Sequence, residues 1–386
     1  MSEATAGSRG GPRTSDSMTE AAAVGGRPLR AGVIGLGWAG QQHLAAYAAD
    51  ERTDLVALAA HEPHLLTEYG EAHQVPLRTQ DWQDLLDADL DVLSIASPTY
   101  LHAPMAIAAM EAGVHVLCEK PMATDGAAAM RMTRAARDTG RVLDVAFNHR
   151  HRGEVSALRS VIEAGVLGRI YYAKTGWLRR AGIPGMGTWF TRSDSAGGGA
   201  LVDIGIHMLD MTLHLMGEPQ VLSASAATHA EFGPVGRGGS GFGVSSRQEH
   251  AGFEVEDLAT AFLRLDGGAT LLLESSWAQW IPYDQCYVML YGSEGGASIE
   301  WGGDARRPYE RLNVWTEMHG VPAELKPEVG PHGLHAAAVD DFLTAVLAGD
   351  HAGRTGADAL VRSQVLDACY ASAARGTEVS LTQEER

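Results

Sequence analysis

Cysteine is scarce in this chain of 386 residues. Only Cys118, Cys286 and Cys369 occur, far apart and without a CxxC pair, so neither a disulfide framework nor a cysteine zinc site is expected. Basic residues are also few, because 30 Lys and Arg stand against 48 Asp and Glu, a formal net charge of −18. This charge repels phosphate backbones and anionic lipids, which argues against nucleic-acid and membrane partners. No apolar run reaches the roughly 20 residues that cross a bilayer, and we expect a cytoplasmic protein.

The chain has enough apolar residues for sizeable cores. Hydrophobic residues make up 45% of it, and its length suits two domains better than one. Residues 1–28 differ, because they are rich in Gly, Ser, Thr and Ala and nearly lack large apolar side chains, so a disordered tail is expected there. Met18 lies in this tail, and the sequence leaves open whether the chain starts at Met1 or at Met18. We divide the remainder into domains over 29–150 and 151–386.

A glycine-rich turn opens the first of these domains. It joins a strand-like run to a helix-like run over 41–49 and consists of Gly35, Leu36, Gly37, Trp38, Ala39 and Gly40. A strand, a Gly-x-Gly-x-x-Gly turn and a helix in this order are typical of dinucleotide-binding domains. The first glycine permits the tight turn, the second lets the pyrophosphate approach the backbone, and the third lets helix and strand pack closely. Strand-like and helix-like runs alternate behind the turn, so an α/β Rossmann domain is predicted.

The residues that would read the adenosine ribose lie about 20 positions after the glycines. The expected acidic residue is missing, because Ala60 occupies its place, His61 follows, and Glu62 comes two positions late. A protonated His61 would favour a 2′-phosphate, but residues 59–77 contain no Lys or Arg. We therefore predict NAD as the cofactor, with NADP as the alternative.

Three further motifs follow the turn. They are Ser97-Pro98-Thr99 with His102 close behind, then Glu119-Lys120-Pro121, and then a Gly triplet leading to Asp203-x-x-x-His207. In this order, over residues 29–377, they resemble the Gfo/Idh/MocA oxidoreductase family. The resemblance implies a Rossmann domain followed by an α/β domain with a large open sheet, and a nicotinamide between the two. It also implies a catalytic set of Lys120, Asp203 and His207.

The second domain reads differently from the first. Beyond residue 152, extended runs joined by Gly-rich turns replace the strand–helix alternation, which is typical of an open, mostly antiparallel sheet. A sheet with one uncovered face predicts a homodimer or homotetramer formed through that face.

Oxidation of an alcohol requires a base for the hydroxyl proton, and an imidazole suits this role at neutral pH. His207 is the predicted base. If the surrounding stretch is helical, Asp203 lies on the same face four residues earlier, where it would orient the ring and stabilise the imidazolium. Lys120 would stabilise the developing alkoxide. Asp210 and His214 continue the polar stripe, and a solvated helix face is expected there.

Further contacts to the cofactor are expected from strand ends and loops of the first domain, namely Ala60, His61, Ser97, Pro98, Thr99, His102, Glu119 and Asn148. Helix capping is the alternative for His102. Trp189 is expected on the nicotinamide or on a sugar ring, with a core position as its alternative. Sugar contacts are also expected from Arg150, Arg179 and Arg180. A salt bridge at the domain junction is the alternative for Arg150, and a solvated strand end is the alternative for the other two.

The stretch from Leu178 to Thr191 resembles the glucoside 3-dehydrogenase branch of this family. The predicted function is oxidation of a secondary hydroxyl, at C3, of a sugar or glycoside to a keto sugar, with hydride transfer to NAD. Alternatives are an inositol, polyol or aldose 1-dehydrogenase, an NAD-dependent glycosidase of the same fold, and a non-catalytic regulator that senses dinucleotide. The short-spaced histidines at 61, 64, 149 and 151 fall in no zinc pattern, and no metal is expected.

Overall fold

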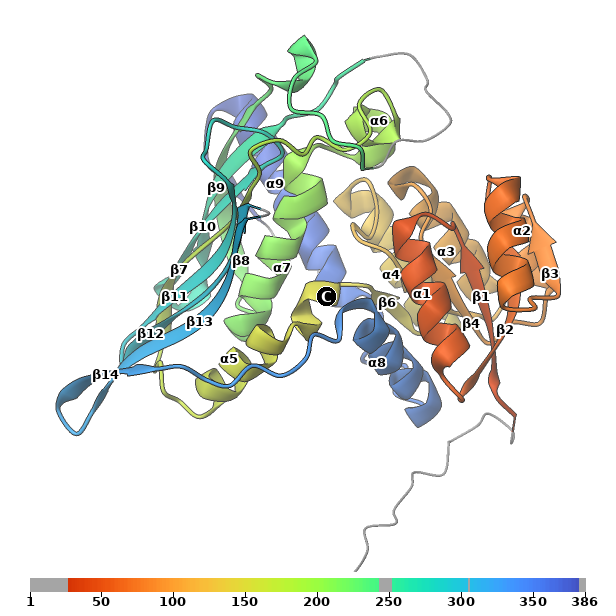
Figure 1. Cartoon of the computed structure of the whole chain (residues 1–386), viewed down its shortest axis with the longest axis horizontal. Coiled ribbons are helices and arrows are strands. Elements are labelled where there is room, and N and C mark those ends of the chain that lie inside the picture. The colour runs from red at the N-terminus through yellow and green to blue at the C-terminus, as the bar shows by residue number, and fades with distance from the viewer. Residues whose placement is uncertain (1–26, 243–251, 305, 382–386) are drawn as a thin grey trace, which may run out of the picture.

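The computed structural model describes residues 27–242, 252–304 and 306–381. It consists of a parallel sheet between helices and a larger sheet with helices over one face (Figure 1). The predicted α/β fold, a Rossmann domain plus a large and mostly antiparallel sheet, is confirmed. Apart from Arg27 and Pro28, the expected tail lies outside the described residues, as does Met18. No helix in the described ranges is both long and apolar enough to cross a membrane.

The six strands of the parallel sheet run in the order β3-β2-β1-β4-β5-β6. They are β1 (Leu29–Ile34), β2 (Thr53–Ala59), β3 (Leu77–Thr79), β4 (Val92–Ile95), β5 (His115–Cys118) and β6 (Leu143–Val145). Four of them are nearly continuous apolar runs, because helices cover both faces of the sheet. The strand order reverses between β1 and β4, which is the place where open α/β sheets bind ligands beyond their carboxyl ends.

Five helices pack on this sheet. Four of them connect its strands: α1 (Trp38–Ala49), α2 (Pro63–Ala72), α3 (His102–Glu111) and α4 (Gly126–Thr139). The fifth, α8 (Leu334–Ala348), comes from the C-terminal part of the chain and lies beside α1 (Figure 1). Its Phe342 shares a buried cluster with Leu44 and Tyr47 of α1. The second segment therefore returns to complete the Rossmann layer, and the division at residue 150 stays a prediction.

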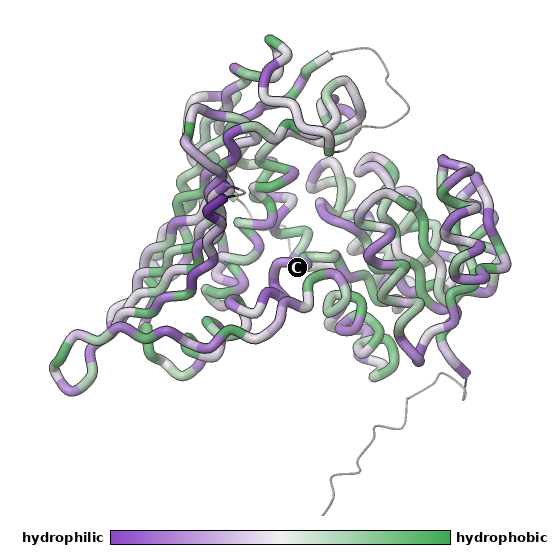
Figure 2. Tube along the Cα trace, viewed as in Figure 1, coloured by the Kyte–Doolittle hydropathy of each residue, from purple (hydrophilic) through white to green (hydrophobic). Residues whose placement is uncertain are grey.

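The larger sheet has nine strands in the order β14-β13-β12-β11-β7-β10-β9-β8-β15. They are β7 (Ile170–Leu178), β8 (Val221–His229), β9 (Leu258–Leu265), β10 (Thr270–Ser276), β11 (Asp284–Gly292), β12 (Gly295–Asp304), β13 (Arg307–Met318), β14 (Val321–Leu325) and β15 (Val379–Ser380). Only the β7–β10 pair is parallel among these described strands. Hydrophilic and hydrophobic residues alternate along them (Figure 2), as expected where one face is buried and the other is open.

Helices α5 (Gly153–Glu163), α7 (Ile206–Leu215) and α9 (Ala357–Arg375) lie on the side of this sheet that faces the Rossmann domain, while the short α6 (Ser193–Ala196) lies above them (Figure 1). A π-helical turn over Leu201–Gly205 leads into α7. On the opposite face, Tyr172 and Tyr291 stack at 5.2 Å with Lys174 over both rings. Oligomerisation through this face stays a prediction.

Candidate active site

A cavity of about 1150 Å³ lies at the carboxyl ends of the Rossmann strands and extends to the second sheet and to α7. This volume exceeds the typical range for one small ligand, up to about 1,000 Å³, and leaves room for a dinucleotide with a further small molecule. Most of the predicted site residues line it: Gly35, Leu36, Gly37, Trp38, Ala39, Ala60, His61, Ser97, Pro98, Thr99, Glu119, Lys120, Asn148, Arg179, Trp189, Asp203 and His207. Their roles remain predictions, but the structure places them on one continuous surface.

The glycine turn at one end of the cavity fits a dinucleotide. Gly35 has a φ of +88°, and a Cβ there would lie 2.4 Å from the carbonyl oxygen of Ala96. A Cβ on Gly40 would lie 1.8 Å from the Gly35 carbonyl oxygen, so α1 packs against the turn only with glycine at this position. A Cβ on Gly37 would meet no described atom within 4 Å. Because Gly37 is also the N-cap of α1, this open space lies over free backbone N–H groups that suit a pyrophosphate.

The end of the cavity beyond β2, where the adenosine is expected, carries no described Lys or Arg. Ala60, His61 and Glu62 line it directly after β2, and Gln80 donates a hydrogen bond to the His61 carbonyl at 2.8 Å. The basic residues of the described lining are Lys120, Arg179 and Arg192, together with histidines. A ribose 2′-phosphate would thus find Glu62 and no fixed cation near it, which agrees with NAD rather than NADP.

Lys120 and Asp203 form an ion pair in the middle of the cavity. The ammonium of Lys120 donates to Oδ1 and to the backbone carbonyl of Asp203, both at 2.9 Å. The indole N–H of Trp277 donates to the other carboxylate oxygen at 2.8 Å. Burial alone would raise the pKa of Asp203, but the charges of Lys120 and Arg179 and the hydrogen bonds from Lys120 and Trp277 together outweigh it and lower the pKa below 3.8. The carboxylate is therefore ionised and holds Lys120 in place.

His207 lies at the start of α7 and is 8% exposed. Its Nδ1 is buried, without a hydrogen-bond partner among the described residues. Burial and the charge of Lys120 lower its pKa well below 6.5, so the ring is neutral at physiological pH. The prediction that Asp203 orients this ring is wrong, because its carboxylate oxygens bond to Lys120 and Trp277. The physical reason is the π-helical turn, which changes the spacing that an α-helix gives to residues four apart.

Three residues near His207 were missed from the sequence. The ring of His149 lies 4.6 Å from that of His207, and Trp177 lies 5.9 Å from it. Burial and the neighbouring charge of Arg152 lower the pKa of His149 to about 3, so it is also neutral. Trp277 bonds to Asp203, as described above. His149 directly follows Asn148, which was predicted to contact the cofactor. This position next to a predicted site residue is the sequence feature that could have indicated His149.

Aromatic side chains form another wall of the cavity. Trp189 stacks on Phe190 with ring centroids 3.9 Å apart, and Phe242 lies 6.4 Å from Phe190. All three line the cavity, so Trp189 is not a core residue. Arg179 lies with its guanidinium 4.9 Å from the Trp177 ring. Flat apolar faces beside fixed N–H donors are the surfaces that a sugar ring with hydroxyls can contact.

Arg150 is a structural residue, contrary to the prediction of a sugar contact. It donates to both carboxylate oxygens of Asp210, at 2.8 and 2.6 Å, and lies outside the described cavity lining. Arg362, 1% exposed, donates to the same carboxylate at 2.9 Å. Asp210 is itself only 1% exposed, so the prediction of a solvated face is wrong for it. The predicted alternative, a salt bridge near the domain junction, describes Arg150 correctly.

Two further residues that were predicted to contact a ligand lie outside the described cavity lining, in structural positions. Arg180 donates to the Ile281 carbonyl at 2.7 Å and lies outside the described lining, which leaves Arg179 as the member of the pair at the cavity. His102 is buried with its two ring nitrogens 2.8 Å from the carbonyl oxygens of Pro121 and Ser97. His102 thus ties together the two loops that carry Ser97 and Lys120, and it supports the cavity from outside.

Two groups of side chains in the described ranges have atoms close enough to hold a metal ion: His43, Glu119 and His335, and also Glu154, Glu310 and His332. In the second group Arg152 forms ion pairs with both carboxylates. The expectation of an enzyme without a catalytic metal stays a prediction.

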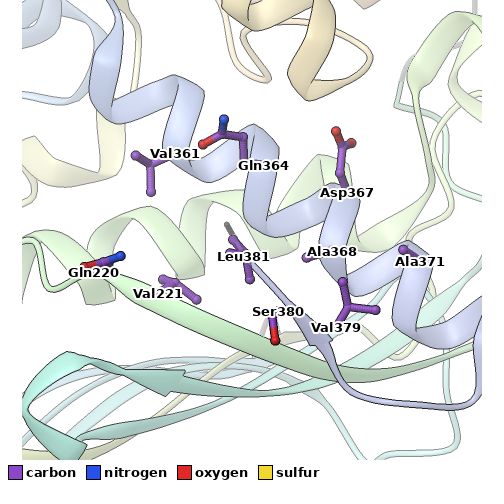
Figure 3. A pocket seen from close by; sticks show the side chains of 10 residues that line it. All are labelled: Gln220, Val221, Val361, Gln364, Asp367, Ala368, Ala371, Val379, Ser380 and Leu381. Carbon is purple, nitrogen blue, oxygen red and sulfur yellow. The ribbon is translucent and has the colours of Figure 1, made fainter. Parts of the chain in front are cut away.

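A second cavity, of about 290 Å³, lies between α9, β8 and β15 (Figure 3). Asp367 is the one ionisable side chain in its described lining, and its carboxylate accepts a hydrogen bond from the backbone N–H of Gly126 at 2.8 Å. No Lys, Arg, His or Cys joins Asp367 in the described lining, so we assign the chemistry to the larger cavity.

Comparisons with known proteins agree with this arrangement. The model of the oxidoreductase family with an NAD-binding Rossmann fold matches residues 29–147, and the Gfo/Idh/MocA C-terminal domain model matches residues 155–298. D-glucoside 3-dehydrogenase of Escherichia coli (strain K12) is 31% identical, covering 92% of this chain and 98% of that protein. Levoglucosan dehydrogenase of Pseudarthrobacter phenanthrenivorans is 33% identical over 69% of this chain and 72% of that protein. A solved structure of levoglucosan dehydrogenase with NADH and L-sorbose matches with a TM-score of 0.78 at 26% identity, covering 93% of this chain and 100% of that chain.

Proposed function

The chain belongs to the Gfo/Idh/MocA family of NAD-dependent oxidoreductases, and from this premise we propose that it oxidises the C3 hydroxyl of a sugar or glycoside to the keto sugar. One observation carries the proposal. A neutral imidazole, that of His207, and a fixed ammonium, that of Lys120, line one cavity together with the glycine turn. Bound NAD supplies the acceptor for the hydride, and the protein supplies the base and the positive charge.

His207 is the proposed base for the hydroxyl proton. A base must be unprotonated when the substrate arrives, and the lowered pKa of His207 keeps it so across the physiological range. With Nδ1 buried, we assign the proton transfer to Nε2. His149 is also neutral at physiological pH, because its pKa is about 3, and it lies against the same ring.

Lys120 stabilises the negative charge that develops on the substrate oxygen. An ammonium carries three protons. Two of them are engaged by the carbonyl and the carboxylate of Asp203, which leaves one for the substrate. Asp203 and Trp277 hold this arrangement before substrate binds, and a donor fixed in advance costs little reorganisation during the reaction.

The walls around this pair suit a neutral sugar. Trp177, Trp189 and Phe190 line the cavity with aromatic surface, and Arg179 offers N–H groups for hydroxyls. Oxidation at C3 rests on the likeness of residues 178–191 to glucoside 3-dehydrogenases and on a relative whose name states that activity. Several residues of that segment line the cavity, so it is placed to select the hydroxyl that reaches His207.

A substrate panel tests this proposal. NADH absorbance is followed with pyranosides, free aldoses, inositols and aryl glycosides, and products are assigned by NMR. We expect NADH formation with a pyranoside and a 3-keto product. A lactone from a free aldose indicates an aldose 1-dehydrogenase, and turnover of inositols alone indicates a polyol enzyme. Release of the aglycone without net NADH indicates a glycosidase, and NAD binding without any turnover indicates a regulator. Each of these outcomes contradicts the proposal.

A further inference from the structure

A chain of buried hydrogen bonds runs through the Rossmann layer, and the chemistry proposed above does not use it. It begins at Tyr47, whose hydroxyl lies 2.9 Å from Ser94 Oγ. Ser94 Oγ in turn lies 2.9 Å from Nδ1 of His43. The other ring nitrogen of His43 lies 3.0 Å from Oε1 of Glu119, and Nε2 of His335 lies 3.4 Å from the same oxygen. All five side chains are buried, although they come from distant parts of the sequence.

The chain of hydrogen bonds ends at Asn148 in the wall of the active-site cavity. Asn148 Nδ2 lies 3.3 Å from Nδ1 of His335. Its Oδ1 is buried and has no hydrogen-bond partner among the described residues. A buried acceptor without a partner costs about 1–3 kcal/mol. Because Asn148 lines the cavity, a ligand is the natural source of the missing donor.

Glu119 sets the direction of these hydrogen bonds. Burial alone would raise its pKa, but the hydrogen bonds from His335 and His43 lower it well below 4.5, so the carboxylate is ionised and only accepts. Each imidazole therefore points an Nε2–H at Glu119. The amide of Asn148 turns its Nδ2 toward Nδ1 of His335, so that ring nitrogen is the acceptor. Asn148 must then donate its NH₂ to His335, and its oxygen is directed away from that ring.

We propose that Glu119 and His335 are positioning residues that fix the amide of Asn148, so that its oxygen accepts a hydrogen bond from the carboxamide NH₂ of the nicotinamide. The adenine amino group is the other N–H₂ donor of NAD, but the residues expected at the adenosine, Ala60 and His61, follow a different strand. The inference rests on the NAD site and deepens the proposed function. It does not depend on which sugar is oxidised.

Such a contact would control the orientation of the reacting ring. The carboxamide is attached to the nicotinamide, so holding its NH₂ selects which ring face is turned toward Lys120 and His207. His335 is suited to this role because α8 returns from the C-terminal segment and packs on α1. Its ring also meets the Trp38 ring edge-on at 5.1 Å, beside the glycine turn.

Cofactor analogues test the proposal without any sugar. NAD, its thionicotinamide analogue and 3-acetylpyridine adenine dinucleotide are titrated against the full chain by quenching of tryptophan fluorescence. The first two keep the NH₂, and the acetyl group of the third lacks it. We expect the wild-type protein to bind the acetylpyridine analogue about tenfold more weakly than the other two, the value of one hydrogen bond. Equal affinity for all three would overturn the proposal, and this comparison needs no variant.

Two variants then test the positioning role. Asn148→Ala and His335→Phe should each bring the affinity ratio of NAD to the acetylpyridine analogue close to one, by weakening NAD and leaving the analogue unchanged. His351→Phe is the matched control, because His351 packs on His115 away from the cavity, and it should keep the wild-type ratio.

Two results contradict the proposal at this stage. One is a folded His335→Phe protein, judged by its melting temperature, that keeps the wild-type ratio. The other is a stoichiometric divalent metal in the purified protein whose removal by a chelator abolishes the discrimination, since His43, Glu119 and His335 would then be metal ligands. Oxidation of the sugar can fail or succeed independently of either result.

Discussion

The same four-residue spacing occurs twice within 12 residues of the second domain, and its two copies do different work. Asp203 and His207 line the active-site cavity, where the carboxylate holds Lys120 and the imidazole has a free Nδ1. Seven residues further on, Asp210 is held by Arg150 and Arg362, and His214 lies 3.0 Å from Arg159. Identical residue types thus line the proposed active site in one copy and contact arginine side chains in the other.

The difference lies in the neighbours that the fold brings to each copy. Asp203 meets one ammonium and an indole N–H, so its charge is balanced while Lys120 keeps a proton for a ligand. Asp210 is buried and meets two guanidinium groups, those of Arg150 and Arg362, which hold its carboxylate from two sides. The His207 ring lies beside the cavity, whereas the His214 ring lies against the guanidinium of Arg159.

The largest expected effect is on catalysis by the first copy. His207→Ala removes the proposed base, and loss of a positioned base lowers the rate by about 10² to 10⁴. NAD affinity, measured by fluorescence quenching, should change little, because His207 faces the reacting hydroxyl rather than the pyrophosphate. His214→Ala makes the same change in the second copy and should retain near-normal turnover. Comparable turnover of the two variants would contradict the assignment of a catalytic role to His207 and of a structural role to His214.

The second copy should matter for stability instead. Asp210→Asn leaves the buried Arg362 with a diminished partner, and breaking a buried ion pair costs about 3 kcal/mol. We expect a lower urea midpoint with KM values close to those of the wild-type protein.

The pH dependence of that stability follows from the lowered pKa of Asp210. In the folded chain its pKa is below 3.8, so the stabilisation is present above pH 3.8 and is lost as the pH falls through the folded-state pKa. The difference in stability between wild type and Asp210→Asn should therefore shrink at low pH. A difference that is independent of pH would contradict the assigned ion pair.

The charge of Lys120 should be visible in the pH profile. Burial and Lys120 both lower the pKa of His207, so the acid limb of kcat/KM should lie below pH 6.5 in the wild-type protein. Lys120→Met removes the charge, and the limb should move to higher pH by about one unit or more in the residual activity. NMR titration of the His207 ring gives the same shift without turnover. An unmoved limb would exclude coupling between the two residues.

The smallest expected effect concerns cofactor choice. Glu62 lines the cavity close to the expected ribose, without a described Lys or Arg beside it, so kcat/KM should favour NAD over NADP. Glu62→Arg offers a guanidinium to a 2′-phosphate and should improve the use of NADP by about tenfold. Glu68→Arg makes the same charge change on the exposed part of α2, outside the described lining, and should not. If both variants improve the use of NADP equally, the long-range effect of the added charge, rather than a direct contact with the 2′-phosphate, determines the preference between NAD and NADP.

The sequence predicted what local motifs encode. Short sequence motifs, only a few residues long, were enough to identify the glycine turn, Lys120, Asp203 and His207. The structure places these motifs at the cavity. Residues defined by distant partners were not predictable in this way. Arg150 finds Asp210, 60 residues away, and that carboxylate is shared with Arg362, another 152 residues on.

His335 illustrates the same limit. It reaches Glu119 because α8 returns to the first domain, and no pattern around residue 335 indicates this. The π-helical turn before α7 is likewise invisible in the apolar periodicity, and it undid the prediction of a direct Asp203–His207 contact. Local chemistry was therefore readable from the sequence, while the pairing of side chains across the fold required the structure.

Deuterium transfer tests the central claim, oxidation at C3 with His207 as base, most directly. A methyl glucoside deuterated at C3 is incubated with NAD and the protein, and the nicotinamide C4 position is examined by NMR or mass spectrometry. The account predicts deuterated NADH and a 3-keto glucoside. The deuterated substrate should react more slowly than the unlabelled one but give the same products, and His207→Ala should nearly abolish the reaction. Unlabelled NADH formed from this substrate, with the deuterium still at C3, would contradict it.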